Sequence, residues 1–312
     1  MPHLASAWDS GHLAIVHGVG HPDSSLSHFD ATDMWEKGSL DFHTRTGWLG
    51  RTLDNLVDDH DPLLGVSVGG LSPSMHAASW RPYALDNPWD LPWTRDFAED
   101  SPSLAAGLNA MIAGPGGTDM ASQVRASQAL VRDVGGRLEP LIAAYDDEDD
   151  DGDDDTSRLA VDLGLVADMI NTGIPTRAFH VSHDGFDTHA DQAWSLPDLL
   201  TTLDDAIRSF QANLGANADR VVIATWTEFG RRPEWNGQGT EHGTAGTQFV
   251  VGPRVVGGHH GEPSPLDRFD DDGNFLVTTD FRDYLGGVVQ HTLGVDADLA
   301  LPGSTRPLEV VR

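Results

Sequence analysis

The chain of 312 residues carries 49 acidic and 19 basic residues, which gives a formal net charge of −30, and it contains no Cys. The absence of Cys excludes disulfides, thiol nucleophiles and Cys-ligated zinc sites. The sequence has no basic stripe of the kind that binds phosphate backbones, so nucleic acid is excluded as a partner.

The charge pattern predicts a protein adapted to salt. Acidic residues are spread along the whole chain, and Lys37 is the only Lys. At molar salt the Debye length falls to ~3 Å, so repulsion among these acids would be screened. We interpret the composition as that of an extreme halophile; the alternative is an ordinary acidic protein.

In chain order, a short helix is expected first, at 2–11. Short apolar runs bounded by Gly, Pro or Asp predict buried strands at 13–19, 63–70, 177–182, 220–226 and 247–252. Apolar residues at helical spacing predict helices at 120–145, 155–173, 195–214 and 280–294. In the helix at 195–214, Ser195 is the predicted N-cap and Pro197 lies in the first turn. Strands that alternate with helices predict the α/β class, with a mainly parallel sheet and helices on both faces.

Two segments do not follow this alternation. Residues 72–119 are rich in Pro, Gly and Trp and predict an irregular excursion over the sheet edge. Residues 146–155 are almost all acidic, and their mutual repulsion predicts a disordered loop rather than a calcium loop. No apolar run is long enough to span a membrane, and the first residues do not read as a signal peptide. A single domain over 1–312, in a soluble protein, is therefore expected.

Ionisable residues follow three of the predicted strands. Ligands in open α/β sheets bind beyond the carboxyl ends of the strands. These ends lead into loops that hold Ser27 and His28, then Asp184, Asp187 and His189, and then Glu228, Arg231 and His242. Any one of these imidazoles alone is better explained as a surface or core residue, but the combined pattern favours a metal site. Mixed nitrogen and oxygen ligands favour Zn²⁺ or Mn²⁺, with Ca²⁺ the less favoured ion.

Ser27 has two interpretations that the sequence leaves open. It stands where a helix is expected to begin, with Asp30 three residues later, as an N-cap would. It could equally be a hydroxyl nucleophile at a helix N-terminus that holds a phosphate or sulfate. A Ser-His-Asp hydrolase is disfavoured, because the G-x-S-x-G pattern is absent.

Several segments resemble a known family. They are, in order, "GHLAIVHGVGHPDSSLSHFDATDMWEKG", "TGWLGRTLD", "HDGFDTHADQ", "TEFGRR", "GTEHGTAGTQFVVG" and "TTDFRDYLGGVVQHTLG". The chain resembles, from about residue 4 to 294, the domain-of-unknown-function family fifteen-oh-one of the alkaline phosphatase and sulfatase superfamily. The resemblance implies an alkaline-phosphatase-like sandwich that binds two metals and transfers phosphoryl or sulfuryl groups through a Ser, a Thr or a modified Cys.

The resemblance also implies roles for individual residues. Asp184 and His189 would be ligands of the first metal, with Asp187 a competing candidate, and Glu228 and His242 would be later ligands. Ser27 lies near the place of the nucleophile. Phe229 stands where the superfamily usually has a His, which weakens one metal site.

The expected function is hydrolysis of phosphate or sulfate esters. One or two divalent ions would act on a small anionic ester, with Arg231 steadying the anion. The alternative is a non-catalytic binding or surface protein of the same superfamily.

One family motif is missing from this chain. Family members usually begin with a strand that ends in a Gly-rich, Asp-containing turn, behind a twin-arginine export signal. We expect that strand to be encoded upstream. The family therefore suggests export to the cell surface, while a cytoplasmic location remains the alternative for the sequence as it stands.

Overall fold

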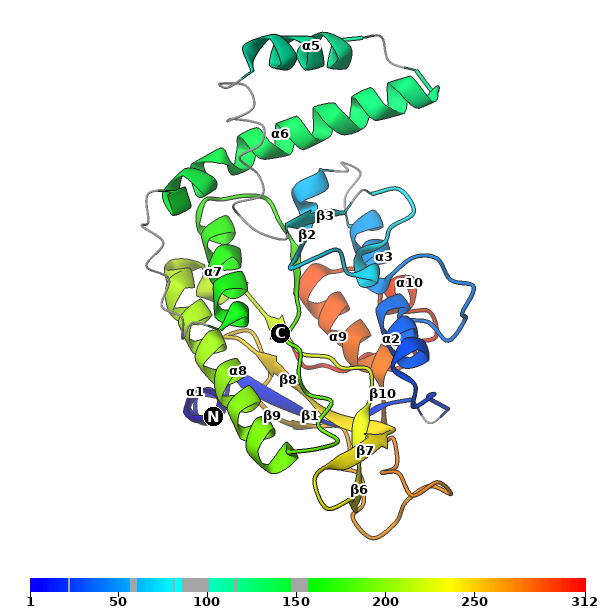
Figure 1. Ribbon diagram of the computed structural model, residues 1–312. Helices are drawn as coiled ribbons and strands as arrows, with labels where there is room; N and C mark the ends of the chain where they lie inside the picture. The colour runs from blue at the N-terminus through cyan, green and yellow to red at the C-terminus, as the bar shows by residue number, and fades with distance from the viewer. Residues whose placement is uncertain (22, 57–60, 81, 86–100, 115–116, 147–156) are drawn as a thin grey trace.

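The computed structural model describes residues 1–21, 23–56, 61–80, 82–85, 101–114, 117–146 and 157–312. Helices and strands are interspersed along the chain, which confirms the α/β class (Figure 1). The helices are α1 (Pro2–Asp9), α2 (His28–Lys37), α3 (Trp48–Asp54), α5 (Pro102–Ile112), α6 (Met120–Asp146), α7 (Arg158–Asn171), α8 (Gln192–Leu214), α9 (Phe281–Leu293) and α10 (Ala297–Ala300). Among these described helices, none has the length and apolar character needed to cross a bilayer.

The strands form three separate sheets. They are β1 (Leu13–Gly20), β2 (Gly65–Val68), β3 (Tyr83–Leu85), β4 (Ala178–Val181), β5 (Ile223–Ala224), β6 (Gly230–Trp235), β7 (Thr240–Gly243), β8 (Ala245–Val251), β9 (Gly258–His260) and β10 (Thr279–Asp280). The largest sheet has the order β10-β1-β8-β5, with β9 also paired to β1. A second sheet has the order β3-β2-β4, and β6 pairs with β7 in the third.

Strand direction differs from the expected single, mainly parallel sheet. The β3-β2-β4 sheet is parallel throughout, and β9 and β10 run parallel to β1. Strand β8, however, is antiparallel to both β1 and β5. The chain passes from β5 to β8 through the β6–β7 hairpin and not through a helix, and such short connections join antiparallel strands.

Two apolar clusters fix the elements that carry the site. In the first, Trp35 of α2 packs against Phe281 of α9, with ring centroids 4.7 Å apart, and both side chains are buried. Tyr284 of α9 donates a hydrogen bond to the Thr225 carbonyl at 2.6 Å, which holds the end of β5. The second cluster joins β2, β3 and β4 to α7, α8 and the last turns of α6. The first cluster therefore holds helix α2 and the loop after β5 on one core.

Some boundaries differ from the sequence prediction. The stretch 72–119, expected to be irregular, contains strand β3 and helix α5, while 86–100 lies outside the described residues. Helix α8 begins at Gln192, after Asp191 with φ +54°, so Pro197 lies inside the helix and Ser195 is not its cap. The Ser195 hydroxyl instead donates to the Asp191 carbonyl at 3.0 Å. Of the predicted acidic loop 146–155, all but Asp146 lies outside the described residues.

Candidate metal centre

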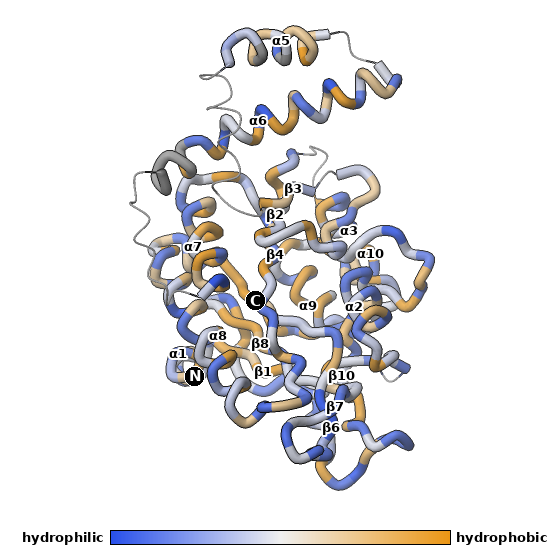
Figure 2. Tube along the Cα trace, viewed as in Figure 1, coloured by the Kyte–Doolittle hydropathy of each residue, from blue (hydrophilic) through white to orange (hydrophobic). Residues whose placement is uncertain are grey.

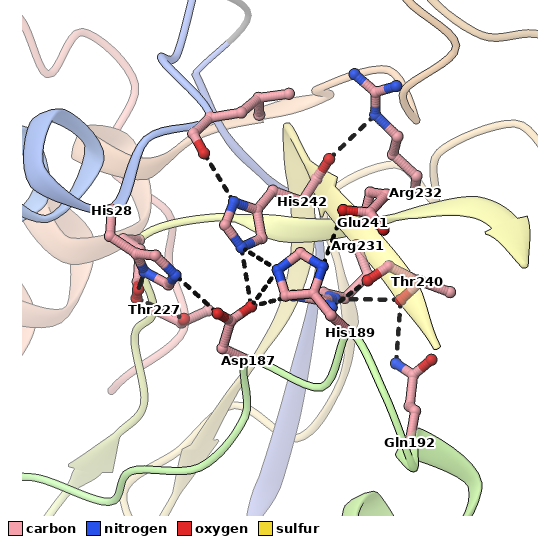
Figure 3. A network of polar contacts seen from close by, with 12 residues as sticks. His28, Asp187, His189, Gln192, Thr227, Arg231, Arg232, Thr240, Glu241 and His242 are labelled. Atoms are coloured by element: carbon pink, nitrogen blue, oxygen red, sulfur yellow. Dashed lines mark hydrogen bonds and ion pairs between the residues drawn. The ribbon is translucent and has the colours of Figure 1, made fainter. Parts of the chain in front are cut away.

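Four segments that are distant in sequence meet in one polar network (Figure 3). They are the first turn of α2, the loop after β4, the loop after β5, and the β6–β7 hairpin. The residues they contribute include His28, Asp187, His189, Glu228, Arg231 and His242. The structure thus brings together five of the seven residues that the sequence predicted, and adds His28.

Asp187 is at the centre of the network. Its Oδ1 lies 2.8 Å from His242 Nε2, 2.9 Å from His189 Nε2 and 2.8 Å from Arg231 Nη1. Its Oδ2 lies 3.0 Å from His28 Nε2. Burial alone would raise the pKa of Asp187, but the hydrogen bonds from Arg231, His242 and His28 outweigh it and hold that pKa well below its usual range. The carboxylate is therefore ionised at every pH at which the protein would work.

Each of the three imidazoles is held from behind by an oxygen. The Nδ1 atom lies 2.8 Å from Glu228 Oε1 in His28, 2.9 Å from Glu241 Oε2 in His189, and 2.7 Å from the Leu26 carbonyl in His242. Carbonyl and carboxylate oxygens only accept hydrogen bonds, so each Nδ1 carries the hydrogen. In the protonated ring the Nε2 atom also carries a hydrogen and donates it to Asp187, whereas in the neutral ring Nε2 presents a lone pair toward that carboxylate.

These lone pairs make the centre electrostatically incomplete. The Nε2 atoms of His189 and His242 lie 2.9 Å apart, and both face the same carboxylate. Lone pairs and a negative charge at such distances repel one another unless a cation lies among them. Protons or a metal ion can supply that positive charge. Two imidazoles and a carboxylate held by outer oxygens are a common donor set for Zn²⁺ and related ions.

Phe229 supports one imidazole and does not act as a ligand. It is nearly buried and stacks on His242 with ring centroids 4.0 Å apart. Its ring also lies 4.9 Å from that of His28. Phe229 therefore contributes packing that fixes the two imidazole rings.

The two adjacent arginines differ in their contacts. Arg231 is committed to the network, because it donates to Asp187 and, through Nε at 3.1 Å, to Thr240 Oγ1. It also donates to the Thr240 carbonyl. Arg232 donates through Nε to the His242 carbonyl at 3.1 Å, and Figure 3 shows its guanidinium directed away from Asp187. Arg231 is thus the cation that faces the centre.

Ser27 lies at the N-cap of α2, beside the network. Its hydroxyl is exposed and makes no capping hydrogen bond. Its neighbours on both sides belong to the site, through the Leu26 carbonyl and the His28 ring. The N-terminus of α2 therefore lies beside the network, and a helix N-terminus favours anions.

Three ionisable residues near the strand ends stay outside the network. Asp184 is exposed, and Gly185 with φ +99° turns the chain between it and Asp187. His183 Nε2 lies 3.3 Å from the Leu199 carbonyl. His180 lies beside Trp226, and burial lowers its pKa to about 4, so that it is neutral. Of the three histidines at 179–192, only His189 therefore takes part in the network.

His28 and Glu241 were not among the predicted ligands. The strand-end argument placed His28 beside Ser27 but gave it no role as a ligand, because the resemblance pointed to other residues. Glu241 precedes His242 on β7 and reaches back to His189. The only signal in the sequence was proximity, since each is adjacent to a residue that was predicted.

The ion-free protein should show a pH dependence that comes from His28. Burial lowers the pKa of His28, but the hydrogen bonds to Asp187 and Glu228 outweigh it and raise that pKa above its usual value. The stability from the protonated ring is therefore full below the unfolded pKa of about 6.5 and is lost as pH rises through the folded pKa. With a chelator present, we expect wild type to lose its advantage in Tm over His28→Gln as pH rises from 6 to 8. With Zn²⁺ present the advantage should instead grow, because metal binding requires the neutral ring. A Tm difference independent of pH in both series would contradict this.

Comparison with known proteins gives a family and no function. Residues 119–277 match the model of the family described as "Protein of unknown function (DUF1501)". No curated protein and no solved structure matches the chain. The matched region contains the loop after β4, the loop after β5 and the β6–β7 hairpin, and so includes most of the network.

Proposed function

Since this chain belongs to the DUF1501 family, whose function is unknown, we propose a function from the site itself: metal-dependent hydrolysis of phosphate or sulfate esters. The observation that carries the proposal is the convergence of the Nε2 atoms of His28, His189 and His242 on the Asp187 carboxylate. Each ring is fixed from behind, so the nitrogens are aimed before any ligand arrives.

The donor set fits a divalent transition metal. One ligand atom from each of His28, Asp187 and His242 lies within 4.8 Å of the others. His189 Nε2 is in contact with two of these three residues. Imidazole nitrogen with one carboxylate suits Zn²⁺ or Mn²⁺ better than Ca²⁺, which prefers oxygen throughout. The set supports one ion, with Glu228 and Glu241 orienting the rings and not binding metal directly.

The residues around this donor set suit an anionic ester. A divalent ion held there would supply Lewis-acid polarisation of the ester oxygen. Arg231 presents a fixed positive charge at the same carboxylate, and the N-terminus of α2 adds backbone N–H donors. The Ser27 hydroxyl is exposed at that N-terminus and is free to act as the nucleophile.

The same proposal includes the finer fold assignment. We assign the domain to the alkaline-phosphatase-like architecture, with one metal-binding site at the strand ends. Support comes from Asp187 and His189, which lie in the loop after β4, in agreement with the rule for ligand binding in α/β sheets.

Metal analysis followed by an ester assay tests the proposal. Protein purified in high salt is stripped with a chelator and titrated with Zn²⁺ and Mn²⁺ by calorimetry, and its turnover of 4-nitrophenyl phosphate and 4-nitrophenyl sulfate is then measured. We expect tight binding of one ion, and turnover that depends on it. His189→Gln should weaken binding by ~10–100-fold or more, while His183→Gln, a matched change outside the network, should leave it unchanged.

The two candidate functions give different results. Binding of metal without turnover of any ester would favour the non-catalytic alternative, a binding or surface protein. No metal binding by the folded chain would overturn the metal centre itself. Equal loss in His189→Gln and His183→Gln would show that general destabilisation had been measured, not ligation.

A further inference from the structure

Helix α6 carries a mainly apolar seam from Met120 to Leu141, interrupted by one Ser. Its members recur at alternating spacings of four and three residues, as in helices that pack along one another. They are Met120, Val124, Ser127, Val131, Val134, Leu138 and Leu141. A straight helix that packed only at its end would not need this repeat in its first half.

Among the residues that the structure describes, partners cover the second half of the seam and leave the first residues of the seam exposed. Val134 and Leu138 are completely buried and Leu141 is 3% exposed, because they pack into the cluster with β2, β4 and α8. Met120 is 80% exposed and Val124 51% exposed. Figures 1 and 2 show why: the first half of α6 stands away from the body of the protein, and its apolar positions recur along the free part of the helix.

The preceding helix α5 does not cover the exposed half. At about 3.6 residues per turn, Ser122 and Arg125 lie on the side of α6 opposite the seam. Gly114 and Gly117 lie against that opposite side, since a Cβ on Gly114 would lie 3.0 Å from the Arg125 side chain and one on Gly117 would lie 2.9 Å from Ser122 Oγ. Ser122 is accordingly 5% exposed. The seam faces outward at Met120, Val124 and Ser127, and Val131 is half-buried.

Charge restricts what can cover this surface. The chain has a net charge of −30, so two copies repel each other over most of their surfaces. Residues 101–118, which form α5 and the turn after it, contain no Asp, Glu, Lys or Arg. The seam residues from Met120 to Val131 are uncharged as well. The α5–α6 unit is thus a projecting surface on which two acidic copies could meet without placing acid against acid.

We propose that the exposed half of the α6 seam is the contact surface of a homodimer, in which it packs against the same seam of a second copy. The pairing is isologous, with Ser127 near the two-fold axis and the larger side chains on either side of it. Ser127 is small and allows the two helices to approach closely. The pairing covers the apolar positions that the body leaves free, and it makes a bundle with α5 of each copy on the outside.

The absence of Cys allows a clean test. Single-cysteine variants Ser127→Cys and Ala126→Cys are made in full-length protein that otherwise has no thiol. Residue 126 is exposed but faces about a quarter-turn away from the seam. Under mild oxidation in high salt we expect a disulfide-linked dimer from Ser127→Cys only, because a disulfide needs Cα atoms within ~4.4–6.8 Å.

Sedimentation equilibrium of the protein without cysteines provides the independent measurement. Wild type should sediment as a dimer that tightens as salt rises, since repulsion is screened and apolar contact is strengthened. Val124→Glu should sediment as a monomer, while Ala126→Glu, with the same added charge, should remain a dimer. Both substitutions lie on exposed positions, and retention of the helical circular dichroism signal would confirm folding.

Two results would overturn the proposal. One is a wild type that remains monomeric at every concentration and salt tested, which would mean that the seam is covered by its own chain or by a different protein. The other is equal cross-linking of the two cysteine variants, which would show random collision and not a defined contact. Neither result depends on metal binding or on ester hydrolysis.

Discussion

Replacing Asp187 with Asn is expected to abolish tight binding of a divalent ion and to reduce ester hydrolysis by at least ~100-fold. Asp187 contacts three imidazoles and one guanidinium, and Asn keeps its shape while removing the charge. The three Nε2 lone pairs would then lose the anion that makes the centre attractive to a cation. Calorimetric titration with Zn²⁺ and steady-state turnover of 4-nitrophenyl phosphate measure the two effects separately.

Asp184→Asn is the matched control for this substitution. Asp184 lies in the same loop and is exposed, but it takes no part in the network. Both aspartates are candidate ligands on the sequence alone, so the pair of variants distinguishes between them. We expect Asp184→Asn to retain metal affinity and turnover. If Asp184→Asn loses metal while Asp187→Asn keeps it, the assignment of the centre is wrong.

Removing salt should unfold or loosen the whole protein. The 49 acidic residues face only 19 basic ones, and at ~0.01 M salt the Debye length reaches ~30 Å, which leaves this repulsion unscreened. We expect most of the helical circular dichroism signal to be lost on dialysis toward zero salt and to return when KCl is restored. The effect acts on the compact state as a whole, so it should exceed that of any single substitution on the surface.

A neutral osmolyte distinguishes the screening of charge from the strengthening of apolar burial. Sucrose strengthens burial by being excluded from protein surfaces, but it does not screen charge. If repulsion among carboxylates is the cause, sucrose should restore far less helix than KCl does. Full helicity near zero salt would show that the acidic composition has another origin.

The sequence predicted that His189, Glu228 and His242 would meet with Asp184 or, as the competing candidate, Asp187, and the reason is physical. Each follows an apolar run that had to be a buried strand, and the ends of neighbouring strands meet at one edge of the protein. The same reasoning placed the ends of β1, β4 and β8 within a residue or two of where they lie. Strong apolar periodicity likewise gave α6 and α9 nearly complete.

The pattern of apolar runs did not predict which segments contact one another. Nothing local distinguishes Asp184 from Asp187, because their difference arises from the turn at Gly185. The β6–β7 hairpin was not predicted as strands, since "GRRPEW" and "TEHG" are polar and do not alternate. The antiparallel direction of β8 follows from that missed hairpin. His28 became a site residue only through the packing of Trp35 and the rest of α2 on the core.

The β6–β7 hairpin also determines how the site can come apart. It carries Arg231, Thr240, Glu241 and His242, yet among the described strands β6 and β7 hydrogen-bond only to each other. Two-stranded ribbons have little stability of their own, and such units open locally at a lower free energy than the whole fold. One local opening would therefore remove all four residues from the centre while the core around Trp35 and Tyr284 stays intact. The candidate metal centre and the fold would then have separate melting points, and a bound ion that ties β7 to α2 and to the loop after β4 would bring the two together.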